Sequence, residues 1–156
     1  MKLFFFCILY TLICIWAQYF LPSMDFFVPV LVVMLQLGFF QAAAWAGLFW
    51  MFIHEGTGGL AFGTVILFYA GLLIIFFLGG VFFEISNILF TMFLMLFAAV
   101  YKNWIISVMA TLQGLYLPSQ FSMINILLQA GIYIAAWLIT FTLFKKHFLN
   151  EPVQRK

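Results

Sequence analysis

The sequence predicts an all-α membrane protein with about six transmembrane helices in a single bundle. Of its 156 residues, 68% are hydrophobic and only 6% are charged, and the mean hydropathy is +1.24. A typical soluble domain has roughly 25% charged residues, so a chain this apolar cannot keep its whole surface in water. A bilayer-spanning helix needs about 20 apolar residues, which leaves room for about five to seven spans. The net charge of +2 is too small to indicate a nucleic-acid partner.

The first predicted span covers residues 3–20 and ends at Leu21-Pro22-Ser23. Its apolar run is too long for the core of a typical signal peptide, and no A-x-A-like cleavage site follows it. We therefore expect an uncleaved first helix.

The next uncharged run, residues 26–53, is longer than one span requires, and Pro29 lies in its first turn. As one straight helix it would measure about 42 Å, against a hydrocarbon core of about 30 Å. The run must tilt, kink or break, and the predicted interior break is Gln36-Leu37-Gly38, with Gln41 nearby. Two versions stay open: one kinked span, or a re-entrant half-helix followed by a second helix, whose freed backbone groups would have to be buried in protein.

Four further spans are predicted at residues 60–79, 81–101, 104–117 and 123–144. Gly79-Gly80 closes the first of these, Lys102-Asn103 forms a short turn, and Leu117-Pro118-Ser119-Gln120 separates the last two. Residues 1–144 then form the transmembrane bundle and residues 145–156 a basic cytoplasmic tail. Because the span 104–117 is short, five spans is the alternative.

Lysine and arginine placement predicts the orientation of the bundle. Six spans put all the basic residues on one side, which the positive-inside rule assigns to the cytoplasm; they are Lys2, Lys102, Lys145, Lys146, Arg155 and Lys156. Both termini are then cytoplasmic, and Asp25 and Glu84 fall at or near the outer interface.

The stretch around Glu55 is the candidate functional region. Five residues follow one another at steps of four and would form one stripe along a helix: Gly47, Met51, Glu55, Gly59 and Gly63. Gly59-x-x-x-Gly63 is also a pattern that lets membrane helices pack closely. The stripe therefore predicts a helix-packing or partner-contact surface with a carboxylate in its middle.

Glu55 and His54 also have interpretations that involve no function, and these stay open. A carboxylate at the bilayer centre costs at least about 2.5–3.5 kcal/mol and usually has a role, but Glu55 could also be solvated at the cytoplasmic end of the second span. His54 would point about 100° away from Glu55 on a helix, and it could be an interfacial ring. Asn125 and Gln129 are placed to form hydrogen bonds across helices in the last span.

Several functional classes are not favoured by the sequence. It has no cluster of cysteine, histidine and carboxylate residues at metal-ligand spacing, no phosphate loop and no G-x-S-x-G elbow. No predicted span carries the several charges of a proton relay or ion pathway. We therefore expect neither an enzyme nor a cofactor.

The central stretch resembles the rod shape-determining protein MreD family. In that family an acidic residue is followed by glycine four and eight positions later and then by a tyrosine, and Glu55, Gly59, Gly63 and Tyr69 match this spacing. The length, the predicted spans and the basic tail are also similar. The family's acidic residue is usually aspartate, and Met51 occupies a position that is often glycine.

This resemblance implies a non-enzymatic scaffold of the bacterial inner membrane. MreD-like proteins belong to the cell-elongation machinery, with MreC, the actin-like MreB and the membrane enzymes of peptidoglycan synthesis. Membrane lipids and MreC-like proteins are thus the expected partners, and Glu55, Gly59, Gly63, Tyr69 and His54 the expected helix-packing or partner-contact residues.

The same fold is similar to the substrate-binding membrane subunits of energy-coupling-factor transporters. A solute-binding subunit of that kind is the alternative function, and it predicts a closed cavity near the outer face with a few convergent polar groups. A small channel or lipid-handling protein is a third possibility.

Overall fold

The computed structural model describes residues 2–21, 25–56, 63–114 and 123–149. These residues form six α-helices and one π-helical turn, and no strand occurs among them. The elements are α1 (Lys2–Phe20), α2 (Phe27–Gln36), α3 (Phe40–Gly56), α4 (Thr64–Phe82), α5 (Ile88–Leu112), α6 (Met123–Phe144) and η1 (Lys145–Leu149).

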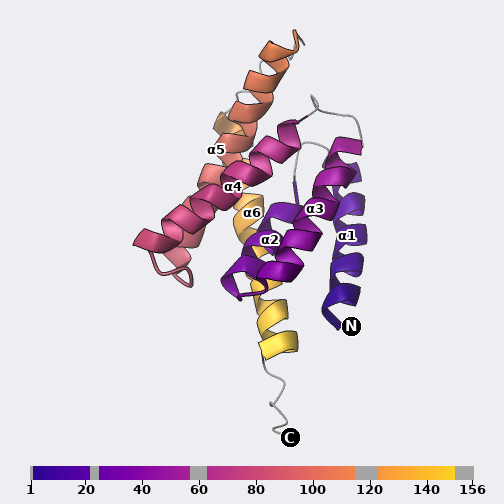
Figure 1. Cartoon of the computed structure of the whole chain (residues 1–156), viewed down its shortest axis with the longest axis vertical. Coiled ribbons are helices and arrows are strands. Elements are labelled where there is room, and N and C mark those ends of the chain that lie inside the picture. Colours follow the sequence, from indigo (N-terminus) through magenta and orange to yellow (C-terminus); the bar gives the residue numbers. More distant parts are fainter. Residues whose placement is uncertain (1, 22–24, 57–62, 115–122, 150–156) are drawn as a thin grey trace, which may run out of the picture.

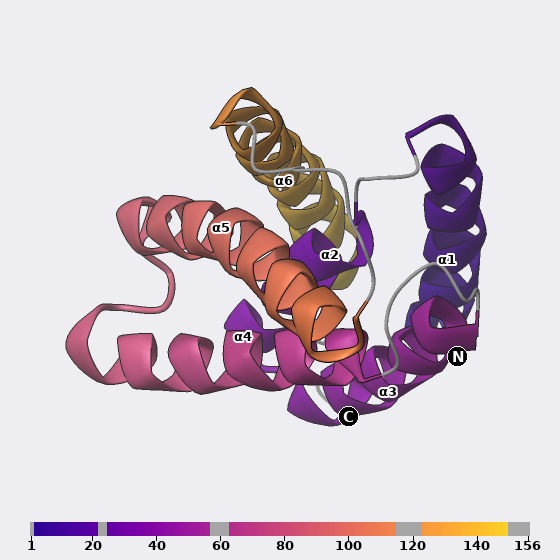
Figure 2. The same cartoon turned by 90° about the horizontal axis from the view of Figure 1, so that it is seen from above.

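The short helix α2 lies at the centre of the bundle, with α3, α4, α5 and α6 around it and α1 at the periphery (Figures 1 and 2). Every residue from Phe27 to Leu35 is buried. At 10 residues α2 is only about 15 Å long, too short to cross a bilayer. Its apolar side chains therefore fill a protein core, while the exposed apolar side chains belong mainly to the surrounding helices.

The predicted break at Gln36-Leu37-Gly38 is confirmed. Helix α2 ends at Gln36, α3 begins at Phe40, and Gly38 adopts a φ of +79°, a left-handed conformation that glycine takes without a steric penalty. The Phe39 N–H donates to the carbonyl of Met34 at 2.9 Å and so satisfies one of the backbone groups freed by the break. Of the two versions left open by the sequence, the structure has the half-helix followed by a second helix.

The predicted turn at Lys102-Asn103 is wrong. Helix α5 runs without interruption through both residues for 25 residues, so the predicted spans 81–101 and 104–117 are largely one helix. Lysine is a good helix former, and the side-chain amide of Asn103 donates to the carbonyl of Ala99 one turn earlier, at 2.8 Å. Both polar residues thus fit inside the helix.

The chain passes from α4 to α5 at residues 83–87, a few residues later than the boundary predicted at Gly79-Gly80. Helix α4 continues past the predicted Gly79-Gly80 end as far as Phe82, and Phe83 is extended. The Asn87 side chain then accepts the N–H of Leu89 at 2.9 Å and caps the start of α5. The described residues contain six α-helices, but these are not the six predicted spans: the predicted second span forms two helices, α2 and α3, and the predicted fourth and fifth spans are largely the single helix α5.

Three described helices are long and apolar enough to cross a membrane: Thr64–Phe82, Ile88–Leu112 and Met123–His147. Phe4–Phe20 is a slightly shorter apolar helix. Helix α1 begins and α6 ends at the same end of the bundle (Figure 1). The basic tail predicted at 145–156 starts as a continuation of α6, since Lys145–Leu149 forms a π-helical turn; residues 150–156 lie outside the described part.

Candidate functional site

Glu55 connects the end of α3 to the start of α4. Its carboxylate accepts the backbone N–H of Gly63 at 3.1 and 3.2 Å, through its two oxygens, and the N–H of Val65 at 3.1 Å. The first N–H groups of a helix have no partner within the helix, and they carry the positive end of its dipole. The half-buried Glu55 carboxylate therefore caps α4. By doing so it ties the start of α4 to the end of α3.

The predicted stripe of small residues does not continue along one helix. Helix α3 ends at Gly56, and Gly63 precedes α4 with a φ of +87°. Gly63 thus serves the backbone conformation of the connection, and Gly59 lies outside the described residues. Gly47 does act in packing: a Cβ placed there would lie 3.4 Å from the Leu31 side chain of α2.

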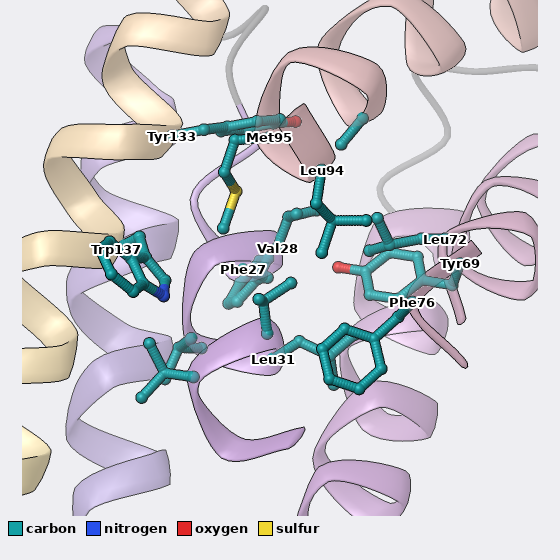
Figure 3. Packing of buried hydrophobic residues seen from close by; sticks show 14 of the residues in the cluster. Phe27, Val28, Leu31, Tyr69, Leu72, Phe76, Leu94, Met95, Tyr133 and Trp137 are labelled. Carbon is teal, nitrogen blue, oxygen red and sulfur yellow. The ribbon is translucent and has the colours of Figure 1, made fainter. Parts of the chain in front are cut away.

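Tyr69 lies in α4 and is 0% exposed. Its ring packs in the core formed by α2, α4, α5 and α6, beside Leu72 and Phe76 (Figure 3). Its hydroxyl oxygen has no hydrogen-bond partner among the residues that the structure describes. A buried hydroxyl normally has one.

His54 turns away from Glu55, as the helical spacing predicts, and meets α1 and the start of α2. Its Nε2 lies 3.7 Å from Oδ1 of Asp25 and 3.3 Å from Nε2 of Gln18, and its ring stands edge-on to Phe27 with centroids 5.1 Å apart. The two neighbouring residues at the end of α3 therefore hold different helices: Glu55 holds α4, while His54 holds α1 and α2.

Asp25 is buried, contrary to the expectation of a carboxylate at the outer interface. It is only 2% exposed, and its Oδ1 accepts the N–H of Phe27 at 2.9 Å, which caps α2. The sequence held a signal for this role, since an aspartate a few residues before an apolar run with proline in its first turn is typical of a helix start.

A second polar group, centred on Gln36, was not predicted. Its amide nitrogen donates to Thr91 Oγ1 at 2.7 Å and to the Ile85 carbonyl at 3.0 Å, and its oxygen accepts the Trp137 indole N–H at 2.8 Å. Gln36 therefore ties the end of α2 to the α4–α5 turn, to α5 and to α6. The uncharged amide inside an apolar run was the available signal, but its partners are far away in the sequence.

Gln129 forms the hydrogen bond across helices that its position predicts. Its amide nitrogen donates to the Tyr133 hydroxyl at 2.8 Å, and its oxygen accepts Nδ2 of Asn103 at 3.3 Å, which joins α6 to α5. Glu84 is exposed and accepts the Ser86 hydroxyl at 2.8 Å. Within the described residues, no three histidine, cysteine or acidic side chains gather as a metal site would require.

No family model, curated protein or solved structure matches this chain. The class of protein is therefore described from its fold alone. The described residues form an all-helical bundle in which three helices are long and apolar enough to span a membrane, and the helices pack around the buried helix α2.

Proposed function

We propose that this protein is a non-enzymatic scaffold of the cell-elongation machinery in the bacterial inner membrane. The observation that carries the proposal is the spacing of Glu55, Gly63 and Tyr69, which is similar to that of the MreD family. Each of the three has a structural task near α4: Glu55 caps it, Gly63 supplies the left-handed turn before it, and Tyr69 is buried within it.

The proposed partner contact lies on the outward face of α3, the helix that carries Glu55. Large side chains stand out along this face, with Trp45 69% exposed, Phe49 59% and Phe52 74%. In a membrane such a row can pack against a partner helix through van der Waals contact. Lys145 and Lys146, which are exposed just after α6, would meet anionic lipid at the cytoplasmic surface.

The test is photo-crosslinking in native membranes, followed by identification of the captured proteins by mass spectrometry. A photoreactive residue at Phe52 should capture MreC-like or peptidoglycan-synthesis proteins. The matched control is the same residue at Phe5, which is 75% exposed on α1. Equal capture from both positions, or no elongation protein from Phe52, would contradict the proposal.

A solute-binding transport subunit is the second candidate, and buried polar groups favour it. Asp25 and Tyr69 are both buried in the bundle interior, beside α2. By contrast, the groove of about 440 Å³ on α6 is lined by apolar residues and is open; it does not have the polar lining that a solute site needs. Capture of an ATPase pair with a coupling subunit in the same experiment would favour this candidate over the scaffold.

A further inference from the structure

The ring of His54, near the end of α3, lies between a hydrogen-bond donor and a hydrogen-bond acceptor. Its Nε2 is 3.3 Å from the side-chain nitrogen of Gln18 on α1 and 3.7 Å from Oδ1 of Asp25, just before α2. The first distance allows a hydrogen bond, whereas the second is too long for one. Of these two partners, the ring nitrogen therefore bonds to Gln18.

The contact with Gln18 defines the protonation state of the ring. An amide nitrogen can only donate, so Nε2 of His54 must be the acceptor, and an acceptor nitrogen carries no proton. In this arrangement the ring is a neutral imidazole whose proton is on Nδ1.

A proton bound to His54 would reverse these preferences. A charged imidazole has an N–H donor on both nitrogens, so its Nε2 would face the Gln18 amide donor to donor. The Asp25 carboxylate only accepts, and a charged donor strengthens the hydrogen bond to it. Imidazole is the side chain whose charge normally changes between about pH 5 and 8. Because the His54 side chain is 16% exposed, a proton from solution can reach it.

In the described part of the chain, the charged group that faces His54 from a neighbouring element is Asp25. Glu55, next to His54 on α3, points to the start of α4 instead, and α1 contributes the uncharged Gln18 amide. Asp25 in turn interacts electrostatically with Lys102 of α5. It also interacts with phenol and thiol groups on α1, α4 and α6, which are Tyr10, Cys14, Tyr69 and Tyr133.

We propose that His54 is a proton-operated latch on helix α1. The neutral ring accepts the Gln18 amide and holds the end of α1 against α3. On binding one proton at Nε2, the ring donates to Asp25 at the start of α2 and releases the last turn of α1. The latch is independent of the proposed scaffold function.

The release is confined to the end of α1, because other hydrogen bonds hold its middle. The Tyr10 hydroxyl donates to the Phe26 carbonyl, and the Trp50 indole N–H donates to Thr11 Oγ1, both at 2.8 Å. The start of α1 lies beside the end of α6 at one end of the bundle (Figure 1). The latch therefore lies toward the opposite end.

The first test reads the protons on the ring directly. The chain has two histidines, so His147→Asn, at an exposed position, leaves His54 as the single one. Isotopic labelling of histidine nitrogens then gives the ring chemical shifts by NMR as the pH is varied. We expect a neutral ring with its proton on Nδ1 at high pH and both nitrogens protonated at low pH. A neutral ring with its proton on Nε2, or no change between about pH 5 and 8, would overturn the latch.

Two substitutions identify the partner of each state. Gln18→Leu removes the donor and should shift the neutral ring toward the Nε2 tautomer, which can donate to Asp25. Asp25→Asn removes the carboxylate and should move the protonation of His54 to lower pH, because the charged ring loses its opposite charge. An unchanged ring in both variants would contradict these partners. The first test changes no interior residue, so it decides the question even if Asp25→Asn does not fold.

A spin label tests the release of α1. The label is attached at Tyr19→Cys, in the last turn of α1, with Cys7 and Cys14 replaced by alanine. The control label is at Phe5→Cys; the two positions are 83% and 75% exposed. Electron paramagnetic resonance should show greater mobility at position 19 at about pH 5 than at about pH 8, no change at position 5, and no response at position 19 in His54→Gln. Unchanged mobility at position 19, or an equal response at position 5 or in His54→Gln, would overturn the latch.

Discussion

Glu55 and His54 are neighbours in the sequence, and yet they hold different helices. Glu55 accepts backbone N–H groups at the start of α4, while His54 lies against Asp25 and Gln18. Because consecutive residues on a helix point about 100° apart, one turn at the end of α3 can serve both sides. At the scale of single residues, this part of the molecule depends on capping rather than on a packing stripe.

Replacement of Glu55 by alanine should lower the free energy of unfolding by about 1–3 kcal/mol, since backbone N–H groups at the start of α4 lose a charged acceptor. Glu55→Gln should cost less, because its amide oxygen still accepts. The measurement is denaturant or thermal unfolding in a fixed detergent. The matched control is Glu84→Ala, an exposed carboxylate bonded to Ser86, and an equal loss in both variants would contradict the capping role.

Gly63→Ala should cost about 1–2 kcal/mol, because a residue with a Cβ is strained at a φ of +87°. Space does not limit this position, since the nearest atom to an added Cβ is Met109 Cε at 3.6 Å. Gly56→Ala, where an added Cβ would meet nothing within 4 Å, is the control and should be neutral or slightly stabilising. Similar unfolding temperatures for the two variants would show that the left-handed backbone conformation at position 63 does not require glycine.

At the scale of helices, α4 and α5 pack closely through Gly71 and Gly79, the second of which had been predicted only to close a span. A Cβ on Gly71 would collide with the Tyr101 ring, and one on Gly79 with the Phe90 ring. Both aromatic residues lie on α5, and the Tyr101 hydroxyl also donates to the Leu67 carbonyl of α4 at 3.3 Å. Each ring thus fills the space that is open because glycine has no side chain.

Gly71→Leu should separate α4 from α5 and lower the unfolding temperature by several degrees, because the leucine side chain would need the space that the Tyr101 ring fills. The control is Gly131→Leu on α6, where an added Cβ would meet nothing within 4 Å. Unfolding followed by the loss of helical circular dichroism compares the two. If Gly131→Leu proves as disruptive as Gly71→Leu, the introduction of a leucine rather than close packing at Gly71 explains the effect, since leucine is a better helix former than glycine.

The sequence predicted elements whose signals are local. The excess length of the run 26–53 and the glycine at its interior predicted the break between α2 and α3. The turn at Lys102-Asn103 failed because polarity alone does not end a helix, whereas Asn87, a capping residue, marked the actual start of α5. The Gln36 hydrogen bonds could not be predicted, since Trp137 lies 101 residues away in the chain.

At the scale of the whole molecule, the uninterrupted helix α5 removes Lys102 from the basic residues that can mark the cytoplasmic side of the membrane. Lys102 lies within α5 and is half-buried, so it does not mark a loop on one side of the membrane. The start of α1 and the end of α6 still lie at the same end of the bundle (Figure 1). Lys2 and Lys145 therefore remain on one side, in keeping with the proposed cytoplasmic location of both termini.

Cysteine labelling tests this arrangement in intact membranes, in a background where Cys7 and Cys14 are replaced by alanine. Cysteines at Lys2 and Lys146 should react with a membrane-impermeant maleimide from the same side. A cysteine at Lys102 should react poorly from both sides, because α5 holds that position inside the bundle. Strong labelling at Lys102 together with Lys2 would restore the loop that the sequence indicated.

The burial of α2 has a consequence for how the protein is made. A ribosome releases the chain from its N-terminus, so α2 leaves the exit tunnel long before α6, whose Trp137 binds Gln36. Helix α2 has 10 residues and is too short to span the lipid by itself. Until α6 is inserted, α2 lacks both contact with water and the neighbouring helices that bury it. Nascent chains truncated before α6 should therefore be substrates for membrane insertases and quality-control proteases, and the native bundle can close only after synthesis is nearly complete.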